Sequence, residues 1–263
     1  MQPASIIRRR GFTLLETVIA IGVLAVLLTG FILVFAPAAA GIKKAIDVQE
    51  ADRLASTLER ELVTLRDGEA SPKIKTGFDK AFFRIKESTG PNQSGNDSGD
   101  PDDALLLYSY RGRMGDFRKD GSPEPLEDTK NKVPGEDYYV QTMMRQRGDP
   151  LFAEDIEALE GSITLVKCVQ LVFDGGVLQP IDEVEKSLRG KIKNPIDPPR
   201  GGDPTGPFDE PDDYPEATIA FQAEFFPVPA RAKSYMIGTN AKFEDFYTSA
   251  KNPVFSRNLA VRR

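Results

Sequence analysis

The apolar positions near the start of this chain form an almost continuous run. From Phe12 to Ala36 there are 25 residues with a single charge. At about 1.5 Å rise per residue, a helix of this length spans roughly 37 Å, which exceeds the roughly 30 Å hydrocarbon core of a bilayer. The run therefore predicts a helix that crosses a membrane.

A second apolar pattern follows at helical spacing. The residues that recur at steps of three and four are Ala51, Leu54, Ala55, Leu58, Leu62 and Leu65. Such a stripe is typical of an amphipathic helix, and Asp67-Gly68 with Pro72 predicts its end. One helix from Phe12 to Asp67 would be about 84 Å long. Proline removes a backbone hydrogen bond, so Pro37 predicts a kink or a short melted stretch over residues 33–37.

The remaining 196 residues, 68–263, are enough for one core. Apolar runs that resemble strands occur at residues 81–85, 104–110, 137–144, 162–173, 217–226 and 254–261. Several of these runs alternate in part, which favours an antiparallel sheet with one covered face. The predicted fold class is α+β: a long N-terminal spine helix, transmembrane in its N-terminal half, packs with its C-terminal half on an antiparallel β-sheet head.

Two polar segments interrupt the head. Residues 92–103 are acidic, and residues 190–216 contain seven prolines. Both are predicted to be solvated loops that contribute little to the core. Clustered carboxylates could alternatively bind calcium, although the spacing fits no known loop motif.

Composition gives little support for catalysis. The chain has no histidine, which excludes histidine-based triads and histidine-ligated zinc. Its only thiol, Cys168, lies in a strongly apolar run and is predicted to be a buried, inert residue rather than a nucleophile. Glu154 and Asp155 form a carboxylate pair of a kind that is common among 40 acidic residues. We therefore expect neither an enzyme nor a cofactor.

Nucleic-acid binding is also not supported by the charge pattern. The net charge is −6, and the basic residues outside the N-terminal segment are scattered. A nucleic-acid interface needs a basic stripe for phosphate contacts. We therefore expect no nucleic-acid partner.

The one charge within the apolar run, Glu16, requires an explanation. A carboxylate near the membrane centre costs about 2.5 to 3.5 kcal/mol on insertion scales. A cleaved secretory signal would fit Ala38-Ala39-Ala40, but its apolar stretch is usually only about 7 to 15 residues. A plain anchor fits the length but gives Glu16 no role. In a third interpretation, the carboxylate has a partner inside the membrane.

Residues 8–16 resemble the processing signal of type IV prepilins and type II secretion pseudopilins. The shared features are the basic residues Arg8, Arg9 and Arg10, then Gly11, Phe12, and Glu16 as the fifth residue of the mature chain. The resemblance implies recognition of the arginine leader, cleavage between Gly11 and Phe12 by a prepilin peptidase, and N-methylation of Phe12. The chain would then divide into a leader (1–11), a transmembrane and spine helix (12–67) and a globular pilin-like head (68–263).

The resemblance also implies partners and a location. Glu16 would meet the methylated amine of a neighbouring subunit and set the register of assembly, because a buried carboxylate must be paired or neutralised. An unpaired, protonated Glu16 is the alternative. Excess basic residues before the span predict a cytoplasmic N-terminus. The head would then lie on the periplasmic, extracytoplasmic side of the inner membrane.

Residues 53–68, 166–177 and 255–263 further resemble, loosely, the J-type minor pseudopilin and PilW-like minor pilins. J-type subunits belong to the small complex that starts and caps a pseudopilus. We therefore predict a minor subunit of type II secretion or type IV pilus-like machinery. The alternative is a membrane-tethered binding or enzymatic domain exported by a pilin-like leader.

Overall fold

The structure is a computed structural model. It describes residues 14–88, 99–184, 186–196, 204–229, 231 and 233–263, with side chains described for all of these except 34–47 and 186. The chain divides into two compact units, Met1–Ala51 and Asp52–Arg263. The last part of the first helix therefore belongs to the same unit as the head.

The first helix, α1, extends from Leu14 to Val63 and contains 50 residues. Of the kink or short melted stretch predicted over residues 33–37, the melted stretch was wrong, because the helical backbone continues through Pro37; the kink stays a prediction. Loss of one backbone hydrogen bond does not end a helix that has many others on both sides. The predicted end at Asp67 was also wrong. After Val63, the Arg66 guanidinium binds the Glu61 carboxylate at 2.7 Å, and the Arg66 backbone N–H donates to Glu69 at 2.8 Å.

Residues 81–85, predicted as a strand, instead lie in the helix α2, Gly77–Glu87. Thr76 caps this helix: its hydroxyl accepts a hydrogen bond from the Asp79 N–H, and the Asp79 carboxylate accepts one from the Thr76 N–H. This reciprocal capping box fixes the first turn. The aromatic residues that suggested a strand are buried along one face of the helix.

The head contains one seven-stranded antiparallel sheet. Its strands are β1 (Leu105–Phe117), β2 (Pro123–Pro125), β3 (Tyr138–Gln146), β4 (Leu159–Asp174), β5 (Val177–Pro180), β6 (Thr218–Pro227) and β7 (Phe255–Arg262). The order along the main path is β2-β1-β4-β6-β7, with β3 paired to β1 and β5 paired to β4. The other five predicted strands are confirmed, and the short β2 and β5 had not been predicted.

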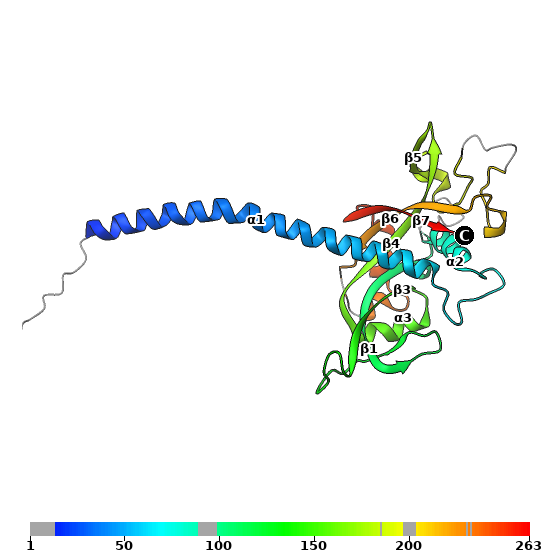
Figure 1. The fold of residues 1–263 in the computed structure, drawn as a ribbon, viewed down its shortest axis with the longest axis horizontal. Coiled ribbons are helices and arrows are strands. Elements are labelled where there is room, and N and C mark those ends of the chain that lie inside the picture. The colour runs from blue at the N-terminus through cyan, green and yellow to red at the C-terminus, as the bar shows by residue number, and fades with distance from the viewer. Residues whose placement is uncertain (1–13, 89–98, 185, 197–203, 230, 232) are drawn as a thin grey trace, which may run out of the picture. The chain divides into compact units, whose positions relative to one another are not determined.

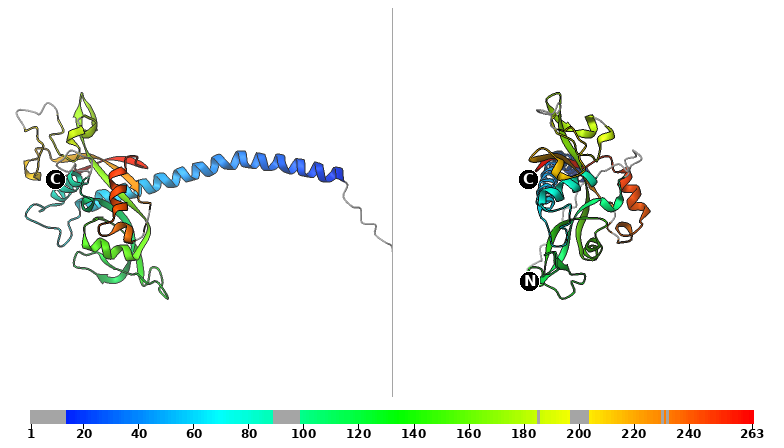
Figure 2. Two further views of the ribbon diagram at one scale, coloured as in Figure 1. Left: turned by 180° about the vertical axis from the view of Figure 1, so that it is seen from behind. Right: turned by 90° about the vertical axis from the view of Figure 1, so that its right-hand side faces the viewer.

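Helices cover both faces of the sheet (Figure 1). One core joins Leu54, Leu58 and Leu62 of α1 and the apolar face of α2 to β1, β4 and β6. A second core lies on the opposite face, where α6 is visible from behind (Figure 2). The predicted packing of the spine helix against the sheet is therefore confirmed, and so is the α+β fold class.

The other helical segments are short. They are α3 (Pro150–Asp155), α4 (Ile181–Val184), α5 (Lys233–Met236) and α6 (Ala241–Ser249), with single turns at Pro101–Asp103, Ile156–Ala158, Lys186–Leu188 and Pro211–Asp213. Aromatic residues of α6, Phe243 and Tyr247, pack in the second core. Together with Phe152 of α3 and Met236 of α5, they close the face of the sheet that α1 and α2 leave open.

The proline-rich segment contributes to the core, contrary to expectation. Ile192, Phe208 and Tyr214 are all buried in the cluster beneath α1 and α2. A backbone bridge joins Ile192 to Phe208, and the Phe208 and Tyr214 rings meet edge to face at 5.9 Å. The few apolar side chains of a polar segment are thus enough to anchor it. Of residues 92–103, only 99–103 are described.

Candidate assembly helix and polar sites of the head

The segment Leu14–Leu33 of α1 has the length and composition of a membrane span. Its mean hydropathy is 2.3, and none of this segment is buried within the chain. Twenty residues at about 1.5 Å each give roughly 30 Å, which matches the hydrocarbon core. These apolar side chains are therefore exposed to a degree that a membrane span would explain.

Glu16 is the only charged residue between Leu14 and Leu33, and it lies in the first turn of α1. A carboxylate in the first turn is favoured by the partial positive charge of a helix N-terminus. The polar residue Thr29 lies later in the same segment, and its hydroxyl donates to the Ala25 carbonyl at 2.8 Å within the same helix. Thr29 therefore needs no partner subunit to satisfy its hydroxyl donor.

The remaining residues of the predicted processing site lie outside the described residues. These are Arg8, Arg9, Arg10, Gly11 and Phe12. Their assignment, like the role of Glu16, stays a prediction from the sequence.

Comparison with protein families adds an independent finding. Residues 7–32 match the family model described as the prokaryotic N-terminal methylation motif. The match supports a type IV pilin-like prepilin signal, which implies processing by prepilin peptidase and pilin assembly in general. Together with the apolar helix, it is consistent with a membrane-anchored pilin. The helix followed by an antiparallel sheet with helices is a pilin-like arrangement. Comparisons with curated proteins and with solved structures find no match.

In the head, the predicted burial of Cys168 is confirmed. The side chain is 1% exposed in β4, and the Ser88 hydroxyl accepts a hydrogen bond from the Cys168 backbone N–H at 3.0 Å. Burial raises the pKa of the thiol to about 12. The thiolate, the reactive form, is therefore scarce at neutral pH.

The adjacent carboxylates Glu154 and Asp155 occupy very different surroundings. The Glu154 side chain is 58% exposed, whereas that of Asp155 is fully buried. Asp155 accepts hydrogen bonds from the Tyr108 hydroxyl, from Arg118 at 2.6 Å and from Arg145 at 3.1 Å. This difference could not be predicted from the sequence, because the partners of Asp155 lie 10 to 47 positions away along the chain.

Both arginines around Asp155 are themselves almost fully buried, with side chains 6% and 5% exposed. Arg145 also pairs with Asp120 at 2.8 Å. Burial alone would raise the pKa of Asp120, but hydrogen bonds from Ser122 and Arg145 lower it to about 2. The network joins β1 and β3 to α3. Every charge in it faces an opposite charge, which indicates a structural role.

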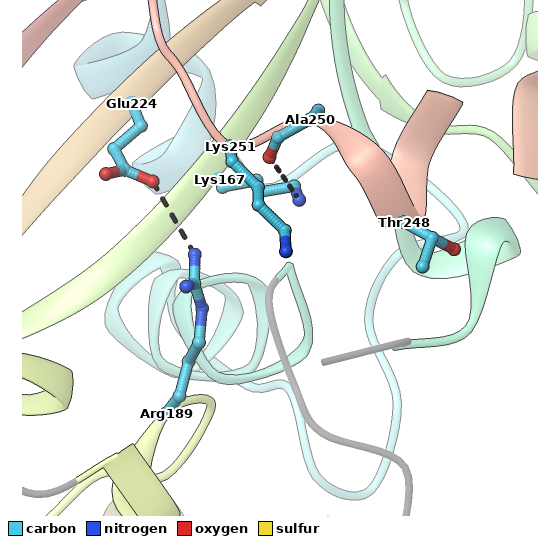
Figure 3. A pocket seen from close by; sticks show the side chains of 6 residues that line it. All are labelled: Lys167, Arg189, Glu224, Thr248, Ala250 and Lys251. Carbon is cyan, nitrogen blue, oxygen red and sulfur yellow. Dashed lines mark hydrogen bonds and ion pairs between the residues drawn. The ribbon is translucent and has the colours of Figure 1, made fainter. Parts of the chain in front are cut away.

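A pocket of about 210 Å³ lies beside β4 and β6 (Figure 3). It is lined by Lys167, Arg189, Glu224, Thr248, Ala250 and Lys251. The buried Lys167 ammonium donates to the carbonyls of Tyr247 at 2.9 Å and Ala250 at 3.1 Å, while Arg189 pairs with Glu224 at 3.6 Å. Burial raises the pKa of Glu224, and the charge of Arg189 opposes this shift. The lining provides charges but no nucleophile next to a base.

Metal binding has no support within the described part of the chain. There, no three acidic or cysteine residues gather closely enough to hold an ion. The calcium alternative concerned both polar segments, 92–103 and 190–216, and it is untested for 92–98 and 197–203, which lie outside the described residues.

Proposed function

We propose that this protein is a non-enzymatic, minor pilin-like or pseudopilin subunit. Prepilin peptidase cleaves it between Gly11 and Phe12 and methylates Phe12. The mature chain then assembles through its N-terminal helix into a filament or into the complex that initiates one. The observation that carries the proposal is the uncovered apolar span Leu14–Leu33, with its single carboxylate, inside the matched methylation motif.

Electrostatics supports a role for Glu16 in assembly. Cleavage creates a positive amine on Phe12, only four residues before the carboxylate. When helices bundle in a low-dielectric environment, the amine of one subunit can neutralise Glu16 of another. Such a pair adds little net stability after desolvation, but it disfavours every stagger that leaves the charges apart. The pair therefore specifies register.

The proposed location follows from the same helix. Three arginines precede the span, so the N-terminus stays in the cytoplasm and the head lies on the extracytoplasmic side of the inner membrane. The loose resemblance to J-type and PilW-like subunits supports a place near the tip of a pseudopilus or pilus, in type II secretion or related machinery.

Processing is tested with the full chain in cells that contain a prepilin peptidase. Mass spectrometry of the purified protein should find N-methylated Phe12 at the mature N-terminus, and Gly11→Val should leave the leader in place. A mature chain that begins at Ala39 or Gly41 would instead identify a secretory signal. In that case Glu16 would be removed with the signal, and the proposal would fail.

Assembly is tested separately through Glu16. We expect Glu16→Leu to insert and to be cleaved normally, since it removes a group that costs about 2.5 to 3.5 kcal/mol in the bilayer. It should nevertheless cross-link poorly to sibling subunits through a photoreactive group at Val18. Glu16→Gln should give an intermediate yield because it keeps a polar acceptor. Thr29→Val is the matched control, and its yield should equal that of the wild type. An undiminished yield in Glu16→Leu would contradict the pairing.

A further inference from the structure

Strand β7 forms an outer edge of the sheet. It pairs with β6 from Thr218↔Arg262 to Phe225↔Phe255. Among the residues that the structure describes, no strand pairs with its other side. Figure 1 shows β7 next to β6 at this end of the sheet. One side of its backbone is therefore available for pairing.

The register identifies which backbone groups face this free edge. The Arg263 N–H donates to the Ala217 carbonyl at 2.8 Å, so these two residues form a hydrogen-bonded pair at the end of the ladder. In antiparallel strands, such pairs alternate along the chain. The odd-numbered residues of β7 therefore bond to β6. The even-numbered residues direct their N–H and C=O groups outward; these are Ser256, Asn258, Ala260 and Arg262.

The outward-facing residues are also uncovered. All four are exposed, whereas the odd-numbered residues of the strand are half-buried or buried. Within the described part of the chain, the outward N–H and C=O groups of these four residues make no backbone hydrogen bond. Three of the four side chains are small, so a further strand could approach the edge without a steric clash.

The other long edge strand, β3, is partly covered by side chains. The Gln141 amide donates to the Thr142 carbonyl at 3.0 Å, and Arg53 of α1 donates to the Thr142 hydroxyl at 3.0 Å. Natural edges are usually blocked by charged side chains, by proline, by a short length or by a cover. Strand β7 has eight residues and no proline, and its charged residues are Arg257 and Arg262. Within the described part of the chain, its outward backbone groups make no hydrogen bond outside the sheet.

Charge decides which kind of strand fits. Residues 252–263 contain no acidic residue and three arginines, of which Arg257 pairs with Asp52 at 2.6 Å and Arg262 makes no ion pair with a described residue. A second copy that paired through β7 would bring the arginines of the two strands together, which is destabilising.

We propose that β7 is a strand-addition site for an extended, acidic segment of a different protein subunit. The added strand would accept hydrogen bonds from the outward N–H groups and donate to the outward carbonyls. A glutamate or aspartate beside Arg262 would provide the charge preference. This interface lies on the head and does not depend on the N-terminal helix.

The test uses the full chain in detergent micelles and two dye-labelled peptides of about eight residues, one alternating valine with glutamate and the other valine with lysine. We expect the glutamate peptide to bind about tenfold more tightly, as measured by fluorescence anisotropy. It should slow amide hydrogen exchange at Asn258, Ala260 and Arg262. The amides of Arg257, Leu259 and Val261 should already be slow in the free chain.

Two variants separate pairing from folding. Ala260→Pro removes one outward N–H and should weaken peptide binding about tenfold, because proline is tolerated at edges whose N–H faces solvent. Ala260→Val keeps that N–H and should bind normally. Arg262→Glu should reverse the preference between the peptides, and it tests the proposal even where the proline variant fails to fold.

Three outcomes would overturn the proposal. The first is equal binding of the two peptides by the wild type. The second is fast exchange of the even-numbered amides in the presence of saturating peptide. The third is slow exchange at these amides only when the chain self-associates, which would assign the edge to a second copy. Because no filament is needed, each outcome is independent of the processing and cross-linking tests.

Discussion

Removing the buried carboxylate of Asp155 should strongly destabilise the head. Asp155 is fully buried and faces two arginines whose side chains are 6% and 5% exposed. Asp155→Ala would remove the fully buried carboxylate that both guanidinium groups share, and Arg145 would keep only Asp120 and Asp149, and Arg118 only Glu124 and Glu154. Breaking a buried ion pair in this way costs about 3 to 5 kcal/mol in free energy of unfolding.

The neighbouring residue provides a matched control. Glu154 pairs with the same Arg118 at 2.8 Å, but its side chain is 58% exposed. Exposed pairs contribute about 0 to 1 kcal/mol, so Glu154→Ala should have little effect. Tyr108→Phe should be intermediate, since it removes one hydrogen bond to a charged group, worth about 1.5 to 3 kcal/mol.

The assay is urea unfolding of the full chain in detergent micelles, followed by near-ultraviolet circular dichroism of the buried tyrosines. With an m-value of about 2 to 3 kcal/mol per M, Asp155→Ala should lower the midpoint by roughly 1 to 2.5 M. If its midpoint fell no further than that of Glu154→Ala, burial would not be the reason for the strength of this network.

Three further predictions concern titrating groups, and the unfolding tests use the same assay. Cys168 should resist iodoacetamide in the native chain and react in urea, because burial raises its pKa to about 12; rapid native labelling would contradict this. Burial and nearby carboxylates raise the pKa of Asp103 from 3.8 to about 6. Ionising it in the folded head is therefore unfavourable, and Asp103→Asn should raise the midpoint at about pH 7.5 but not at about pH 4. An equal rise of the urea midpoint at both pH values would contradict an effect of the Asp103 charge. The lowered pKa of Asp120, about 2 against 3.8, contributes stability that is lost as pH falls between these values. Asp120→Asn should flatten that part of the stability curve, and an unchanged slope would argue against its role.

The sequence by itself determined the features that depend on local pattern. The length of the apolar run predicts the membrane span, because hydropathy and helical rise need no knowledge of distant contacts. The spacing of Leu54, Leu58 and Leu62 likewise predicts the helix face that packs in the core. Partial alternation located β6, and a mostly apolar run located β4.

Only the tertiary structure decided which polar and irregular residues are buried. The aromatic run at residues 81–85 fits either a strand or a helix, and the Thr76–Asp79 capping box and the core beneath it select the helix. Tyr214 lies in a proline-rich segment, yet it packs in the main core. In the sequence, Asp155 and Glu154 are two adjacent acidic residues that no local pattern distinguishes. They differ because Asp155 is buried between Arg145 and Arg118, whereas Glu154 meets Arg118 at the surface, and burial is a property of contacts between distant residues.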